Sequence, residues 1–205
     1  MKNKIIKDAL ALTLITLVAG VALGGVYEIT QDPIARQEAQ AKAEAYEQVF
    51  TDAAAFEEIE MDDTLIQTIR DQLDQEGYKA QSIEEVMRAE DQSGETLGYA
   101  FTVVTSEGYG GDIQFSMGVQ NDGTLNGISI LSIGETAGLG MNADTPAFKD
   151  QFVGKQVEKL QYTKNGATQD DEINAISGAT VTTNAMTNGV NAGLCAFRVM
   201  EGGDQ

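Results

Sequence analysis

The residues with the clearest capacity for chemistry lie in the run from Ile176 to Thr183, which reads I-S-G-A-T-V-T-T. Small hydroxyl residues and a glycine precede a segment whose apolar residues recur at helical spacing, namely Met186, Val190, Leu194 and Phe197. This pattern predicts that a helix begins within the run. The unpaired N–H groups and the positive dipole end of a helix N-terminus favour a phosphate, and hydroxyls there can cap the helix or be esterified. A plain Ser/Thr helix cap is the alternative interpretation.

Within this run, Ser177-Gly178-Ala179-Thr180 resembles the flavinylation motif of the FMN-binding domain family. Members of this family include the G subunit of the Rnf complex and the C subunit of the sodium-translocating NADH:quinone oxidoreductase. In the family, the motif threonine carries FMN through a phosphoester bond, which a separate FAD:protein FMN transferase installs. The resemblance therefore implies covalent FMN on Thr180 in a site shaped by Ser177, Gly178 and Ala179. The two later threonines of the run are then helix caps or competing hydroxyls.

A second string, E-T-A-G-L-G from Glu135 to Gly140, is similar to the family's E-T-x-G-L-G loop. In the family this loop packs near the flavin ring. The resemblance implies that Thr136 is a hydrogen-bond partner of the flavin and Leu139 an apolar contact. Glu135 steadies the loop, lies near the ring or has a capping role. Gly138 and Gly140 permit backbone conformations or close approaches that a side chain would block.

Two further positions bear on this resemblance. The run from Glu107 to Gly111, E-G-Y-G-G, resembles the family's glycine-rich segment before the strand at Ile113, and a tight turn is the alternative to a direct flavin contact. Asn174 stands where the family usually has an aspartate, three residues before the motif serine. An amide keeps the hydrogen-bonding capacity of that position but loses its charge, and the acceptor hydroxyl of Thr180 is unaffected.

The composition excludes several kinds of active site. The 205 residues include one cysteine and no histidine. This chain alone therefore cannot form a disulfide, a clustered-thiol metal site, a Ser-His-Asp triad, a zinc-hydrolase site or a His-ligated haem, and we predict no metal ligands. We interpret Cys195 as a buried structural thiol. Any redox chemistry must come from an organic cofactor or from a partner.

A membrane anchor is predicted near the N-terminus. Residues Ala9 to Tyr27 form a stretch of 19 without a charged side chain, which spans about 28 Å as a helix and matches the hydrocarbon thickness of a bilayer. Lysines precede the stretch and acidic residues follow it, so the positive-inside rule places the N-terminus in the cytoplasm and the later residues on the outer side. A cleaved signal peptide is the alternative, since Ala22 and Gly24 are small enough for a cleavage site.

The part of the chain after the apolar stretch is strongly acidic. The whole chain has 13 basic and 32 acidic residues and a net charge of −19, and residues 9–205 have 10 basic and 31 acidic residues and a net charge of −21. No Lys or Arg occurs from Ala89 to Phe148. Such a surface disfavours nucleic acid and anionic lipid as partners. The acidity fits solubility or an acid- or salt-adapted surface, or else the docking of a partner protein.

Hydrophobic periodicity predicts helices before Gly77 and a sheet after it. Residues 63–75 have a helical pattern with one apolar stripe. Segments rich in β-branched and aromatic residues predict an antiparallel sheet, with a hairpin turn at 121–123 between the last two strands. These segments are 82–88, 97–105, 113–119 and 125–133. A short helix at 145–152 and a short strand at 158–163 are expected to follow.

Together with the resemblance, these elements indicate an α+β fold. It consists of a single N-terminal transmembrane helix followed by an antiparallel-sheet FMN-binding domain with flanking helices. Residues 1–27 are expected to form a cytoplasmic tip and the transmembrane helix, residues 28–77 a helical stalk with packing helices, and residues 78–205 the FMN-binding domain.

The resemblance implies an electron-transfer subunit of a membrane-bound, ion-translocating ferredoxin:NAD oxidoreductase (Rnf) complex, which relays electrons through its FMN on the outer membrane face. The chain length favours the Rnf protein over the usually longer quinone-reductase C subunit. The chain has no G-x-G-x-x-G unit and no cysteine cluster, so we expect a redox subunit without a complete active site of its own. Its expected partners are the other membrane and peripheral subunits of the complex and the transferase. The alternatives are a free-standing membrane-anchored flavoprotein for extracellular electron transfer, and an unflavinylated ligand-binding or scaffold domain.

Overall fold

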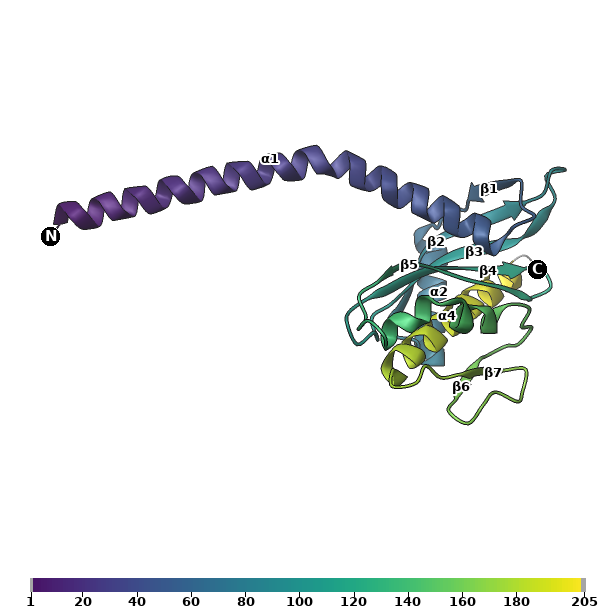
Figure 1. Cartoon of the computed structure of the whole chain (residues 1–205). Coiled ribbons are helices and arrows are strands. Elements are labelled where there is room, and N and C mark those ends of the chain that lie inside the picture. The colour runs from purple at the N-terminus through teal and green to yellow at the C-terminus, as the bar shows by residue number, and fades with distance from the viewer. Residues whose placement is uncertain (1, 204–205) are drawn as a thin grey trace. The chain divides into compact units, whose positions relative to one another are not determined.

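The computed structural model describes residues 2–203 (Figure 1). Its contacts divide the chain into one unit up to Ala41 and a second unit from Lys42 onward. The predicted α+β class is confirmed, with a long apolar N-terminal helix and then an antiparallel sheet with flanking helices. The limits predicted for the three parts, at residues 27 and 77, stay predictions. The elements in chain order are α1 (Lys2–Val49), β1 (Ala55–Glu58), α2 (Asp63–Glu76), β2 (Gln81–Glu90), β3 (Thr96–Thr105), β4 (Ile113–Gln120), β5 (Leu125–Ile133), η1 (Gly140–Asp144), α3 (Pro146–Lys149), η2 (Asp150–Phe152), β6 (Gln161–Thr163), β7 (Glu172–Asn174) and α4 (Thr180–Gly203).

Helix α1 carries the apolar stretch of the sequence. Its most apolar window has a mean hydropathy of 2.3, and none of that window is buried against the protein. Side chains such as Leu14, Val21 and Leu23 are between 61% and 71% exposed. The hydroxyls of Thr13 and Thr16 donate to carbonyl oxygens four residues earlier, at 2.9 Å and 2.8 Å, so they are satisfied within the helix. The helix is long and apolar enough to cross a membrane.

Strands β1 to β5 form one antiparallel sheet in which each strand pairs with its neighbours along the chain. The four predicted strands are confirmed to within two residues at each end. The hairpin turn between β4 and β5 is confirmed as well, with φ of 84° at Gly123 and a hydrogen bond of 2.8 Å from the Gln120 N–H to the Thr124 carbonyl. The sequence pattern did not predict strand β1, because its four residues are mostly exposed and lack an alternating pattern.

The sheet is covered on both faces, as the alternation of side chains along β3 shows. Phe101 belongs to the main core beneath α4, whereas its neighbour Ala100 belongs to a second cluster with Tyr46 of α1 and Phe50, which directly follows that helix. On this second face, the hydroxyls of Tyr46 and Thr102 share a buried hydrogen bond of 2.7 Å. Helix α4 therefore covers the first of these faces together with side chains from α2, α3 and η2, and the candidate site is built at the N-terminal end of α4.

Helix α4 lies close against the sheet because two of its residues are glycines. A Cβ atom at Gly189 would come within 2.8 Å of the Phe115 ring, and one at Gly193 would come within 2.1 Å of the Met117 sulfur. Both strand side chains are fully buried on β4. The apolar residues that predicted this helix are all buried, namely Met186, Val190, Leu194 and Phe197.

The short helix predicted at 145–152 is present in two pieces. Pro146 occupies its first turn as α3, and the chain then tightens into the 3₁₀ turn η2. Phe148 and Phe152 pack edge to face with ring centroids 5.4 Å apart, as their spacing predicts.

The strand predicted at 158–163 was placed too early, because only Gln161–Thr163 pairs as a strand. The N–H and carbonyl groups of Leu160 are hydrogen-bonded to the side chain of Asn191 on α4, at 2.7 Å and 2.9 Å. These groups are therefore unavailable for a sheet. Strand β6 pairs in parallel with β7, which the sequence pattern did not predict.

Cys195 is fully buried on α4, and its thiol donates a hydrogen bond to Glu76 Oε1 at 3.4 Å. Burial, assisted by the Glu76 carboxylate, raises the pKa of the Cys195 thiol to about 12. In the unfolded chain the pKa of this thiol is about 8.5. Below that pH the thiol is protonated in both states and does not change the free energy of unfolding. Above it, ionisation of the thiol in the unfolded chain lowers the free energy of unfolding by up to about 1.4 kcal/mol per pH unit.

We expect Cys195→Ala to remove this part of the alkaline loss of stability, as measured by urea unfolding between the two pKa values. An equal pH slope in both proteins would contradict the assignment.

Candidate functional site

The structure brings the two sequence motifs together at one cavity. The cavity has a volume of about 410 Å³ and lies between the loops after β3 and β5 and the first turn of α4. Of the predicted site residues, six line it, and Ser177 and Gly138 do not. The lining consists of Tyr109, Glu135, Thr136, Leu139, Gly140, Gly178, Ala179, Thr180, Val181 and Thr182.

Thr180 begins helix α4 and lines the cavity with a half-buried side chain. The N–H of Thr183 donates to the Ala179 carbonyl at 3.0 Å and so starts the helical ladder. The N–H groups of the residues before Thr183 have no carbonyl one turn earlier within the helix. The positive end of the dipole of this 24-residue helix lies at the same place. This end of the helix therefore offers electrostatic stabilisation to a phosphate group.

A hydroxyl and a glycine fix the approach of the chain to α4. Thr183 Oγ1 accepts from the Ile176 N–H at 3.0 Å and donates to the Ala179 carbonyl at 2.9 Å, so this buried hydroxyl serves as a cap. Gly178 has a φ of 76°, a left-handed conformation that favours glycine, and a Cβ there would come within 3.0 Å of Leu139 Cδ2. The two motifs therefore approach each other at Gly178 and Leu139.

Glu135 is 8% exposed, and its carboxylate lies between the loops that surround the cavity. Its Oε1 accepts a hydrogen bond from the Gly110 N–H at 3.3 Å. A Cβ at Gly140 would come within 2.5 Å of Oε2 and within 2.6 Å of Thr182 Oγ1. Only glycine leaves room at position 140. Glu135 therefore packs against both loops beside the first turn of α4.

The loop after β5 is a tight turn. The Thr136 carbonyl accepts hydrogen bonds from the N–H groups of Leu139 at 3.1 Å and Met141 at 3.2 Å. Gly138 supplies the φ of 77° that this turn requires. Thr136 and Leu139 both remain exposed, the second to 44%. The turn thus presents one hydroxyl and one apolar side chain at the cavity.

Tyr109, Val181 and Thr182 line the cavity but lie outside the predicted site. Val181 and Thr182 directly follow the motif threonine, and the first turn of a helix exposes such residues to whatever lies at its N-terminus. That signal was present in the sequence. Tyr109 lies between two glycines, a pattern that is equally typical of a turn.

Asn174 lies on β7 and does not line the cavity. Its Oδ1 accepts from the Ala167 N–H at 2.7 Å, and its own N–H donates to Gln151 Oε1 at 2.6 Å. A carboxylate oxygen could accept the first of these bonds equally well. The asparagine therefore changes the charge near the motif while it preserves the contacts that hold this segment.

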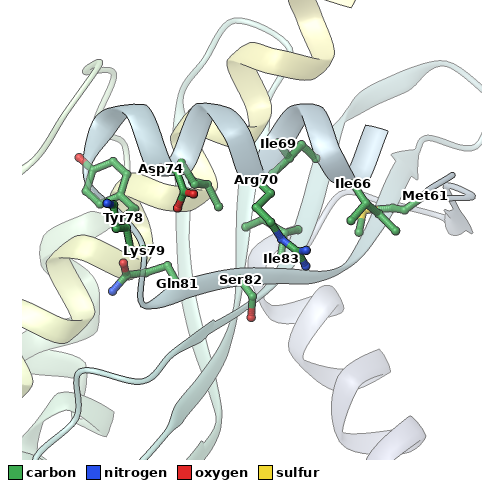
Figure 2. A pocket seen from close by; sticks show the side chains of 11 residues that line it. Met61, Ile66, Ile69, Arg70, Asp74, Tyr78, Lys79, Gln81, Ser82 and Ile83 are labelled. Atoms are coloured by element: carbon green, nitrogen blue, oxygen red, sulfur yellow. The ribbon is translucent and has the colours of Figure 1, made fainter. Parts of the chain in front are cut away.

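A smaller cavity of about 130 Å³ lies between α2 and β2. Figure 2 shows its lining, with Ile66 and Ile69 from α2 and Ile83 from β2. Within the described part of the chain, the Tyr78 hydroxyl and Gln81 Oε1 are buried there without a hydrogen-bond partner. No residue of either motif lines this cavity, so the larger one is the candidate functional site.

The residues of the larger cavity fit a phosphorylated aromatic ligand such as FMN. Its volume of about 410 Å³ lies within the usual range of small-molecule sites, about 300–1,000 Å³. None of the lining residues is Lys or Arg, so a phosphate would depend on the helix N-terminus and on hydroxyls. Leu139, Val181 and Tyr109 offer apolar surface to a flat ring.

Comparisons with known proteins identify the family of the chain. Residues 108–194 match the FMN-binding domain family, and residues 1–49 match the RnfG N-terminal region. The G subunit of the Na(+)-translocating ferredoxin:NAD(+) oxidoreductase complex of Acetobacterium woodii is 32% identical over 95% of this chain and 92% of its own length. The proton-translocating counterpart of Clostridium ljungdahlii is 28% identical over 98% of this chain and 96% of its own. The crystal structure of Shewanella oneidensis NqrC has a TM-score of 0.49 at 21% identity, over 58% of this chain and 59% of that one. The chain therefore belongs to the family of G subunits of ion-translocating ferredoxin:NAD(+) oxidoreductase complexes.

Proposed function

We propose that this chain is an electron-transfer subunit of a membrane-bound, ion-translocating ferredoxin:NAD oxidoreductase complex and carries FMN on Thr180 through a phosphoester bond. The observation that supports this most directly is the cavity where the S-G-A-T run meets the E-T-A-G-L-G loop. Related proteins named as G subunits of such complexes align with nearly the whole chain. The FMN, when bound, supplies the electron-transfer chemistry.

In this proposal the motif at the start of α4 holds the phosphate end of the cofactor. Thr180 provides the ester oxygen, and the first N–H groups of α4 with its dipole stabilise the phosphate charge. Ser177, Gly178 and Ala179 shape the turn that leads the chain into the helix, and Gly178 supplies the positive φ. The covalent link keeps the cofactor on the protein outside the cytoplasm, where a dissociated FMN would diffuse away.

The loop after β5 accommodates the ring end. Thr136 offers a hydroxyl and Leu139 an apolar contact at the cavity, while Gly138 maintains the turn that exposes them. Glu135 steadies this loop through its contact with the Gly110 N–H. The roles of these residues are to position the ring and to limit the access of water to it.

The proposed topology follows the charge distribution. Residues 1–27 form the cytoplasmic tip and the transmembrane helix, residues 28–77 the stalk and packing helices, and residues 78–205 an FMN-binding domain on the outer side. Lys4 and Lys7 precede the apolar stretch and acidic residues follow it, which supports this orientation. The partners are the other membrane and peripheral subunits, and an FAD:protein FMN transferase matures the site.

Intact mass tests this proposal on the chain purified from its native membrane. We expect a mass above that of the sequence by one FMN less one water. Trypsin would leave Thr180 within the peptide 165–198, where fragmentation distinguishes it from Thr182 and Thr183. We also expect other subunits of the complex to copurify. An unmodified native chain would overturn the covalent attachment, and a chain that purifies alone would favour a free-standing protein.

A further inference from the structure

The two edges of the five-stranded sheet differ in how they are protected. Strand β1 closes one edge with only four residues, of which Glu57 and Glu58 are charged. Strand β5 forms the other edge with nine residues, L-N-G-I-S-I-L-S-I, and contains neither a charged residue nor a proline. Short length, charge and proline are common features that keep an edge strand from pairing with another chain. Strand β5 has none of these three.

The main chain of β5 is hydrogen-bonded on its outer side at its first residue. The Leu125 N–H donates to the Lys155 carbonyl at 2.8 Å, and the Leu125 carbonyl accepts from the Gly154 N–H at 2.8 Å. Within residues 2–203, no backbone group outside β4 hydrogen-bonds the main chain of residues 126–133. Alternate residues of an edge strand direct their N–H and carbonyl groups away from the sheet. These groups are therefore available to an extended backbone.

A β-bulge in this strand leaves one leucine outside the core of the domain. Ile130 pairs with Phe115 and Ser132 pairs with Gln114, so Leu131 has no partner residue on β4. The side chain of Leu131 is half-buried and belongs to neither of the two core clusters. Ser132, which follows it, is exposed. Leu131 is thus an apolar side chain at an open strand edge, where another chain can bury it.

The charge around this edge restricts what can pair with it. No Lys or Arg occurs from Ala89 to Phe148, a range that contains β3, β4 and β5. On the strand next to Ser132, Gln114 Nε2 donates to the carboxylate of exposed Glu84 at 2.6 Å. A second copy of this chain would bring two domains of the same strongly negative charge together, which is unfavourable. A segment that contains Lys or Arg and no acidic residue avoids that repulsion.

We propose that an extended segment of a partner protein, with Lys or Arg and without acidic residues, adds to β5 as a sixth strand and buries Leu131. Main-chain hydrogen bonds supply the affinity in this mode of recognition, and side-chain contacts supply the specificity. Strand β5 leads directly into the Glu135 to Gly140 loop, so the partner contacts the domain beside the candidate cavity. The inference goes beyond the proposed function and does not require FMN on Thr180.

Site-specific photocross-linking in the native membrane provides the first test. A chain with p-benzoylphenylalanine in place of Ser132 should cross-link to a second protein, through a segment with Lys or Arg and without acidic residues. The same replacement of exposed Glu58, on the opposite edge, is the control and should give no product. A cross-link to another copy of this chain, a cross-link to an acidic segment, equal yields at both positions or no product at Ser132 would overturn the inference. The Thr180→Val chain should give the same product, so failure of the proposed function is detected separately.

Hydrogen–deuterium exchange tests whether the contact is main-chain pairing, and it needs no variant. Peptides that cover residues 130–133 should exchange about tenfold more slowly in the chain with its cross-linking partner bound than in the chain purified alone, because paired amides are protected. Peptides that cover β1 should exchange equally in both samples. Equal exchange at 130–133 would overturn the inference.

Three variants of Leu131 test the apolar contact and the charge of the partner. Leu131→Val keeps an apolar side chain suited to a strand and should keep the native cross-linking yield at Ser132. Leu131→Lys should lower this yield by about tenfold, and Leu131→Glu should lower it less, because the partner segment is basic. Urea unfolding of each purified variant shows that its domain is folded. A native yield in Leu131→Lys, or a greater loss in Leu131→Glu, would overturn the inference.

Discussion

Thr180→Val is expected to abolish the FMN adduct completely while the fold persists. Valine has nearly the shape of threonine but has no hydroxyl, so no phosphoester can form at this position. Thr180 is half-buried at the start of α4, and we expect the folding free energy to change by about 0.5 kcal/mol or less. Intact mass and in-gel flavin fluorescence measure the adduct. Electron transfer through the complex should fall with it, because the rest of the lining provides no other redox group.

The matched control for this variant is Thr64→Val, the same chemical change at an exposed position on α2. This chain should carry FMN at the native level. The more demanding comparison is with Thr182→Val, which alters a second threonine of the cavity lining and should leave the adduct on Thr180. An adduct that persists in Thr180→Val would contradict the assignment, and fragmentation of the peptide would show which hydroxyl carries it.

Gly193→Val is expected to lower the free energy of unfolding of the second unit by about 3 kcal/mol. A Cβ at this position would already come within 2.1 Å of the sulfur of Met117, which is fully buried on β4. Valine adds two further methyl groups, so α4 must move away from the sheet or the methionine must leave its place. Urea unfolding of the full-length chain in detergent, followed by tyrosine fluorescence, measures the loss.

A double variant identifies the cause of that loss. Met117→Ala alone removes a buried side chain and should cost about 2–5 kcal/mol. In Gly193→Val/Met117→Ala, the space vacated by methionine can accept the valine, so the combined loss should be smaller than the sum of the two. Gly202→Ala, where a Cβ would meet nothing within 4 Å, is the glycine control and should stay within about 0.5 kcal/mol of the native value. Additive losses would show that Met117 is not the obstacle.

Most of the sheet could be predicted from the sequence because its signals are local. The alternation and β-branched content of 97–105 and 125–133 favour strands whatever surrounds them, and Gly123 marks the turn. Strands β1 and β7 have only four and three residues, and they exist because distant segments pair with them. Such pairing cannot be read from a short window of sequence.

The buried face of helix α4 could be predicted from the sequence, but its close approach to the sheet could not. The spacing of Met186, Val190 and Leu194 indicates a buried face. The local sequence does not show that Gly189 and Gly193 lie against strand β4. An isolated glycine lowers helix propensity, but it does not indicate which other element packs against the helix at that position. The same limit explains why the predicted strand at 158–163 begins too early. The side chain of Asn191 on α4 hydrogen-bonds the backbone of Leu160, the residue before β6.

The motif residues of the candidate site could be named from the sequence, but their meeting at one cavity could not. It depends on the close approach of Gly178 to Leu139 and on the insertion of Glu135 between two glycine-containing loops. Tyr109 lies in a run for which the sequence left a tight turn and a flavin contact as alternatives. Its place at the cavity follows from hydrogen bonds between Glu107 and α4, which join residues far apart in the chain.

The two faces of the sheet are filled in opposite ways. Beneath α4 the helix contributes glycine, and β4 contributes the bulk of Phe115 and Met117. On the other face Phe50, which directly follows α1, contributes its ring, and the sheet offers the small residues Ala100 and Gly118. A Cβ at Gly118 would come within 2.9 Å of that ring. A slip of β3 or β4 by one residue would place bulk against bulk on one side and leave voids on the other. The same slip would turn Thr102 and Ser116, which lie on the second face, toward the core beneath α4, so strand register is encoded here by side-chain volume as well as by polarity.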